Sequence, residues 1–151
     1  MIWFEDMPVG RTDSFGSIHV TREDSLDFAH KFDPQPFHVD DGAAAANPLF
    51  GRLSASGWHT AAMGMRMTAD FWASLGGRAI LGGAGIDELR WLKPVYPGDT
   101  LRTESEVIDA RPSASKPDLG IVRFRTTLFN QDDVPVMSHV SNILVRRRPA
   151  D

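Results

Sequence analysis

Cysteine is absent from this chain of 151 residues. Disulfides, thiolate nucleophiles and sulfur-ligated metal sites are therefore excluded, and the chain has no need of an oxidising compartment. An excess of positive charge is also missing, because Asp and Glu number 20 against 16 for Lys and Arg, which gives a net charge of −4. Since a nucleic-acid binder needs a basic face, we expect a small-molecule partner and no nucleic acid.

Long apolar runs are lacking as well. The longest weakly polar stretch, residues 53–65, is shorter than the roughly 18–20 residues that span a bilayer. The N-terminus carries Glu5 and Asp6 where a signal peptide has basic residues. We therefore expect a cytoplasmic protein with no membrane partner, folded as a single domain over residues 1–151.

Helices are predicted in the first half of the chain. Residues 13–20 are predicted to form a strand and residues 21–32 a short helix that Pro34 ends, which leaves a stiff loop from Asp33 to His38. A short helical patch is expected at 43–46. Residues 58–75 contain no proline and have apolar residues at helical spacing. They predict one long helix, buried on most sides, with Trp58 and Met65 on an apolar face and an ion pair between Arg66 and Asp70.

In the second half of the chain, residues that face the core alternate with polar residues at a period of two. Strands are expected at 86–92, 101–107, 122–128 and 134–146, with a bend at Gly82–Gly85 and an exposed loop at 109–118. The sequence thus predicts an α+β fold, in which a curved antiparallel sheet wraps around one long central helix. A single subunit would leave a sheet edge open, so we expect a homodimer or a higher homo-oligomer.

Three separated stretches resemble one family. The run F-A-H-K-F-D-P-Q-P-F-H-V-D, from Phe28 to Asp40, is similar to the hydratase motif of the MaoC-like dehydratases, which include the (R)-specific enoyl-CoA hydratases. Residues 50–57 resemble the run before that family's central helix, and residues 91–101 a segment shared by many hotdog proteins. Three family residues, a glycine, an asparagine and a histidine, are replaced here by Phe32, Gln35 and Ser56. The resemblance implies a hotdog fold and an acyl-CoA substrate.

Asp33 and His38 are the candidate acid/base pair. Adding water to a trans-2-enoyl thioester, or removing it from the (R)-3-hydroxyacyl product, needs a base, an acid and a group that stabilises the thioester oxyanion. Apolar neighbours such as Phe32 and Phe37 would raise the pKa of Asp33 and make it a better base. Gly57 begins the long helix, where backbone N–H groups favour an oxyanion, so it is the third catalytic candidate.

The expected substrate-binding residues surround these three: Gln35, Phe37, Ser56, Trp58 and His59. Ser54 and Ser56 are candidate caps of the long helix. No H-x-x-x-H ligand pair occurs, so neither a metal nor a cofactor is expected beyond the CoA of the substrate. Arg146–Arg148 could meet CoA phosphates, but a solvated strand end is the preferred interpretation.

Other interpretations remain open. By itself, Asp33-Pro-Gln-Pro is an ordinary turn. A hotdog thioesterase would place its carboxylate on the long helix, where Asp70 is the only acid. A non-catalytic acyl-CoA-binding subunit would explain the changes at Gln35 and Ser56. His59 could equally be a solvated or capping residue.

Overall fold

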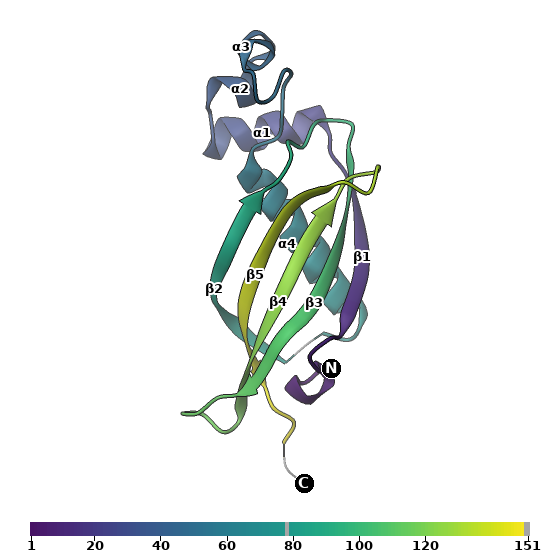
Figure 1. Ribbon diagram of the computed structural model, residues 1–151, viewed down its shortest axis with the longest axis vertical. Helices are drawn as coiled ribbons and strands as arrows, with labels where there is room; N and C mark the ends of the chain where they lie inside the picture. The colour runs from purple at the N-terminus through teal and green to yellow at the C-terminus, as the bar shows by residue number, and fades with distance from the viewer. Residues whose placement is uncertain (78, 150–151) are drawn as a thin grey trace.

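The computed structural model describes residues 1–77 and 79–149. One long helix lies against a five-stranded sheet, and three short helices form a separate group at one end of the sheet (Figure 1). The elements in chain order are η1 (Phe4–Asp6), β1 (Thr12–His19), α1 (Arg22–Phe32), α2 (Pro36–Val39), α3 (Asp41–Ala46), α4 (Gly57–Ser74), β2 (Ile80–Trp91), β3 (Thr100–Pro112), β4 (Leu119–Phe129) and β5 (Pro135–Arg146).

The sheet is antiparallel throughout, in the order β1-β3-β4-β5-β2. Strand β2 follows α4 in the chain but lies at the sheet edge opposite β1, so α4 makes the crossover (Figure 1). Residues of β4 alternate mainly between buried and partly buried, as the period of two predicts. The predicted α+β arrangement of a curved antiparallel sheet around one long helix is confirmed.

Helix α4 is capped by Ser56, whose hydroxyl accepts the backbone N–H of Trp58 at 3.2 Å. The helix ends before Gly76 and Gly77, whose φ values of 79° and 78° glycine adopts without strain. Its buried side chains are Thr60, Met63, Met67 and Trp72. The predicted ion pair between Arg66 and Asp70 is present at 2.8 Å.

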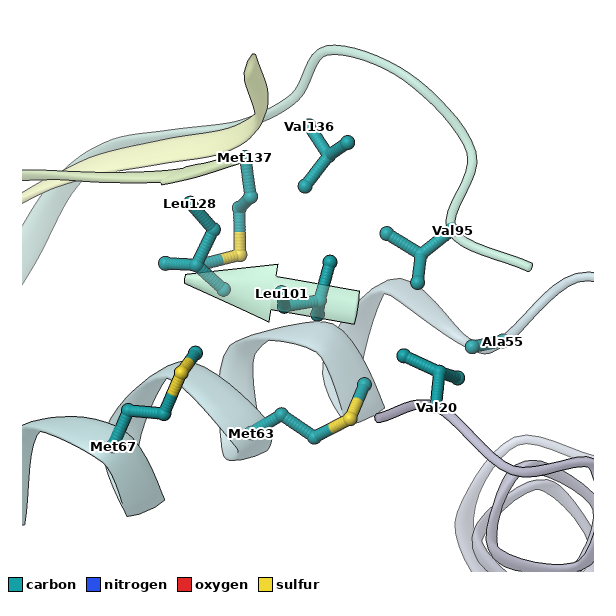
Figure 2. Close-up of a cluster of buried hydrophobic side chains, with 9 residues drawn as sticks. All are labelled: Val20, Ala55, Met63, Met67, Val95, Leu101, Leu128, Val136 and Met137. Carbon is teal, nitrogen blue, oxygen red and sulfur yellow. The ribbon is translucent and has the colours of Figure 1, made fainter. Parts of the chain in front are cut away.

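The core between α4 and the sheet is made of aliphatic and methionine side chains. Met63 and Met67 of α4 face Leu101, Leu128 and Met137 of the sheet (Figure 2). Ala55 and Val95, on the segments before α4 and after β2, extend this cluster toward the short helices. Such a core fixes the start of α4 against the sheet, since burial of each large aliphatic side chain contributes roughly 1.5–3 kcal/mol.

Several boundary predictions were wrong. Strand β2 begins at Ile80, ahead of the predicted start at residue 86. Residues 33–38 are not all loop, because α2 begins at Pro36. Proline at the first position of a helix fits the helical φ and lacks only an N–H that would have no acceptor there. The predicted loop at 109–118 is shorter, because β3 continues to Pro112. A register shift between Val107 and Asp109 lets the ladder with β4 continue.

Helix α4 is less buried than predicted. Trp58 is 57% exposed and Met65 59% exposed, although both belong to the predicted apolar face. The helix carries apolar residues on two faces, and this chain's own sheet covers only the one with Met63 and Met67. The other face adjoins β2, because Trp58 meets Trp91 edge to face with ring centroids 5.0 Å apart.

Candidate functional site

A cavity of about 450 Å³ lies where the short helices meet the start of α4 and the segment after β2. Six of the eight site residues predicted from the sequence line it: Asp33, Gln35, Phe37, His38, Gly57 and Trp58. The remainder of its wall includes side chains that the sequence did not single out, among them Leu49, Phe50, Trp91 and Lys93. A cavity of this size is typical of small-molecule sites.

Asp33 lies at the end of α1, where its backbone N–H donates to Ala29 O at 2.9 Å. Both carboxylate oxygens accept hydrogen bonds. Ser56 Oγ donates to Oδ2 and Gln35 Nε2 donates to Oδ1, each at 2.7 Å. The carboxylate is therefore held from two sides by the residues that replace the family's histidine and asparagine.

These bonds set the charge of Asp33. Burial alone would raise its pKa, but the hydrogen bonds from Ser56 and Gln35, and the charge that His38 carries when it is protonated, place the pKa below its ordinary value. The expectation of a raised pKa was wrong. Phe32 is 72% exposed and does not line the cavity, so it does not supply the expected apolar surroundings.

His38 is buried on α2, with 5% of its surface exposed. Its Nδ1 lies 2.9 Å from the carbonyl oxygen of Ser54, which can only accept, so Nδ1 carries a hydrogen. Its Nε2 lies 3.5 Å from Asp33 Oδ2. The Phe37 ring packs against the imidazole edge to face. In the neutral imidazole, Nε2 is thus an acceptor, so it forms no direct hydrogen bond with the ionised carboxylate, and a donor such as water can bridge the two.

Gly57 is the first residue of α4. The Trp91 indole Nε1 donates to its carbonyl oxygen at 2.8 Å, and a β-carbon at this position would overlap the indole ring, 2.6 Å from Nε1. Its N–H belongs to the first turn, where donors have no intrahelical acceptor. Glycine here lets tryptophan pack on the helix start while the positive end of the helix dipole borders the cavity.

Ser56 and His59 lie outside the cavity lining. Ser56 is fully buried and reaches the site through Asp33. The His59 ring stacks on Phe28, with centroids 4.8 Å apart, and burial lowers its pKa. Ser54, expected as a cap, instead contacts His38. Within the described residues, no group of three His, Cys, Asp or Glu side chains is arranged to hold a metal.

Comparison with known proteins gives these features a context. The model of the MaoC like domain matches residues 6–128. The chain belongs to the MaoC-like family. A MaoC-like dehydratase from Rhodospirillum rubrum superposes with a TM-score of 0.88 and 38% identity, over 99% of this chain and all of that one. This MaoC-like chain therefore has the hotdog fold that its motifs imply.

Two further relatives have more specific names. The (R)-hydratase PhaJ1 from Pseudomonas aeruginosa superposes with a TM-score of 0.69 and 25% identity, over 97% of this chain and 87% of that one. A mesaconyl-CoA hydratase from Cereibacter sphaeroides is 47% identical over 64 residues, which cover 42% of this chain and 18% of that protein. Together with the family, these relatives indicate a hydratase or dehydratase. No helix in the described part of the chain is long and apolar enough to cross a membrane.

Proposed function

We propose that this MaoC-like protein hydrates trans-2-enoyl-CoA to (R)-3-hydroxyacyl-CoA, or catalyses the reverse dehydration. The observation that carries the proposal is the approach of His38 Nε2 to Asp33 Oδ2, 3.5 Å apart on the wall of a cavity that Gly57 also lines. In this proposal the two side chains are the acid/base groups and the start of α4 is the oxyanion site that hydration of a thioester requires.

His38 carries the proton in this mechanism. A water molecule donates one hydrogen bond to Nε2 and the other to Asp33, and its oxygen attacks C3 of the enoyl group. Its proton passes to Nε2, which forms an imidazolium beside the ionised Asp33. Nε2 then delivers that proton to C2, so the water is added completely and both side chains return to their starting charge. Because its pKa is low, Asp33 stays ionised throughout.

Attack at C3 places negative charge on the thioester oxygen. The N–H of Gly57, at the positive end of α4, is the donor that we assign to this oxygen. Removing one such donor from an enzyme typically slows turnover by about 10²–10³-fold. The protein needs no metal or cofactor in this scheme, since proton transfer and hydrogen bonding supply the catalysis.

The test follows the ultraviolet absorbance of the conjugated thioester with short, medium and branched enoyl-CoA substrates. We expect hydration by the wild type and a loss of about 10²–10⁴-fold in kcat for Asp33→Asn and for His38→Gln. Asp27→Asn and His19→Gln, which change exposed side chains of the same types, serve as matched controls with unchanged kcat. Unchanged absorbance with every chain length, or full activity in Asp33→Asn, contradicts the proposal.

Two alternatives have less support. Asp70, the carboxylate that a thioesterase would use, is absent from the cavity lining and forms an exposed ion pair with Arg66. Gln35 and Ser56, the departures from the family motif that suggested a non-catalytic subunit, both donate hydrogen bonds to Asp33 and so hold its carboxylate in place. Release of free CoA thiol that persists in Asp33→Asn would favour the thioesterase.

A homodimer is the assembly that we propose. Strand β2 is a sheet edge, and large apolar side chains are exposed along it and on the neighbouring face of α4: Trp58, Met65, Leu81, Ile86, Trp91 and Leu92. Pairing of β2 with β2 of a second copy would satisfy the edge and cover these side chains. We call this set of six residues the β2/α4 surface.

A further inference from the structure

We propose that Lys93 is an anion-recognition residue of the cavity and binds a carboxylate or phosphate group of the substrate. The inference rests on the proposed function, because the thioester that fills the cavity is the molecule whose charge Lys93 would meet. If the inference holds, Lys93 is one of the residues that determine which substrates bind well.

Lys93 shares a wall of the cavity with its chain neighbours Leu92 and Pro94. Among the described residues that line the cavity, it is the only lysine or arginine, and Asp33 is the only carboxylate. Asp33 is already engaged by Ser56, Gln35 and His38. The positive charge of Lys93 is thus not needed by the acid/base pair.

The Lys93 ammonium forms no ion pair within the described residues. Three other exposed cations on the short helices and α4 pair with carboxylates: Arg22 with Asp41 at 2.7 Å, Lys31 with Asp27 at 3.0 Å and Arg66 with Asp70 at 2.8 Å. Arg52 has no ion pair with any described residue and lies over the Tyr96 ring, 4.0 Å from its centroid. An unpaired ammonium offers three hydrogen-bond donors as a compact point charge, which suits a carboxylate or a phosphate.

The backbone at Lys93 is held firmly. The N–H groups of Leu92 and Lys93 both donate to Val136 O, at 2.8 and 3.3 Å, and Pro94 restricts the following φ. Only the side chain is free to adapt. A fixed attachment point with a flexible stem lets one cation reach anions of somewhat different length while its position on the wall stays constant.

The surroundings strengthen the effect of this charge. Most of the cavity wall is aromatic or aliphatic, with Phe37, Phe50, Trp58 and Trp91 among its members, and low-dielectric walls focus the field of a charge inside them. The chain as a whole carries a net charge of −4, which repels an anionic substrate. A local cation at the cavity offsets that repulsion. The anion is either a carboxylate on the acyl chain or a phosphate of CoA.

Calorimetry on the full chain distinguishes an acyl carboxylate from a CoA phosphate as the bound anion, and it does not require turnover. Succinyl-CoA is a saturated thioester with an acyl carboxylate, and butyryl-CoA is its neutral-chain counterpart. The N-acetylcysteamine thioesters of both acids lack the phosphates. We compare the wild type with Lys93→Gln, which keeps much of the stem, and Lys93→Arg, which keeps the charge. Lys116→Ala, at an exposed lysine in the loop 113–118, is the control.

If the acyl carboxylate is recognised, Lys93→Gln weakens binding of both succinyl thioesters about tenfold and leaves both butyryl thioesters unchanged. If a CoA phosphate is recognised, both CoA thioesters weaken and neither N-acetylcysteamine thioester does. In either case Lys93→Arg and Lys116→Ala bind like the wild type. Equal affinities of Lys93→Gln and wild type for all four probes overturn the proposal, as does a loss for neutral butyryl-N-acetylcysteamine.

Failure of this inference is separable from failure of the proposed function. None of the four saturated probes can be hydrated, so a protein without hydratase activity still gives an answer about Lys93. Conversely, turnover of crotonyl-CoA by the wild type would uphold the hydratase whatever the binding data for Lys93→Gln show. For an active enzyme, mesaconyl-CoA and crotonyl-CoA give the matching comparison of KM.

Discussion

Asp33 is fixed by donors that lie far apart in the sequence. Gln35 is two residues away and Ser56 is 23 residues away, yet both reach the same carboxylate at 2.7 Å. Hydrogen bonds to the ionised form outweigh the burial that would raise its pKa. The side chain is therefore held in its ionised form, as the proposed mechanism requires of a group that orients water and stabilises the imidazolium of His38.

Ser56→Ala tests this arrangement. The change removes one donor to Asp33 and the cap of α4, so the pKa of Asp33 rises, and the most acidic part of the kcat/KM profile, which reports protonation of Asp33, shifts to higher pH. A carboxylate with a lowered folded-state pKa stabilises the fold above its unfolded pKa of about 3.9, and this stability is lost as pH falls through the folded-state value. The variant loses part of it, together with about 0.5–2 kcal/mol from the cap.

The pH profile and urea unfolding are measured side by side. Thr21→Ala is the control, because it removes the cap of α1, where Thr21 accepts the Asp24 N–H, without touching Asp33. It should lower stability and leave the pH profile in place. An acid limb that stays unmoved in Ser56→Ala would show that Ser56 serves only as a cap.

At the level of single residues, the sequence motif identified Asp33, His38 and Gly57, and the structure brings all three to one cavity. The motif could not reveal the partner of His38, because Ser54 is 16 residues away and contacts it mainly through a backbone carbonyl, which any residue possesses. Lys93 was missed for a related reason: it reaches the cavity only because β2 returns along the sheet edge.

At the level of elements, one prediction based on proline was correct and another was wrong. Pro34 ends α1 at Phe32 as predicted, but Pro36 starts α2 rather than prolonging a loop. Proline excludes a residue from a helix interior and is equally compatible with a loop and with the first helical turn. Local sequence therefore left the surroundings of His38 undecided. The spacing of apolar residues located α4 well but could not say which of its two apolar faces meets this chain's own sheet.

Gly57 of α4 and Trp91 of β2 pack against each other where the two elements meet. In Gly57→Ala the new methyl group overlaps the Trp91 indole, so we expect a loss of about 1–3 kcal/mol in the free energy of unfolding and a lower kcat, because the start of α4 must shift. Urea unfolding and steady-state kinetics measure the two effects.

The double variant Gly57→Ala/Trp91→Ala separates overlap from helix propensity. Removing the indole removes the clash, so the double variant should be more stable than the sum of the two single losses implies, with a coupling of about 0.5–3 kcal/mol. Strictly additive losses would show that the indole moves aside without cost, and would contradict a rigid junction at Gly57.

At the level of the whole molecule, the β2/α4 surface gives a prediction about assembly. We expect the wild type to have twice the chain mass of 16.7 kDa in light scattering after size-exclusion chromatography. Met65→Glu should shift it toward the monomer, because an unpaired carboxylate in an apolar interface costs several kcal/mol. Val9→Glu changes an equally exposed apolar residue outside this surface and should leave the mass unchanged. A monomeric wild type, or a Met65→Glu dimer, rules out this interface.

The edge-to-face contact of Trp58 and Trp91 also means that binding in the cavity can be followed by tryptophan fluorescence. Two of the chain's four tryptophans line the cavity wall, and each is about half exposed in the single chain, whereas Trp72 is buried in the core. A thioester that enters the cavity displaces water from the parts of both indoles that line it, so their emission should shift to shorter wavelength as the site fills. Intrinsic fluorescence thus offers an occupancy signal that is independent of chemistry, and Trp58→Phe or Trp91→Phe would assign that signal to one indole.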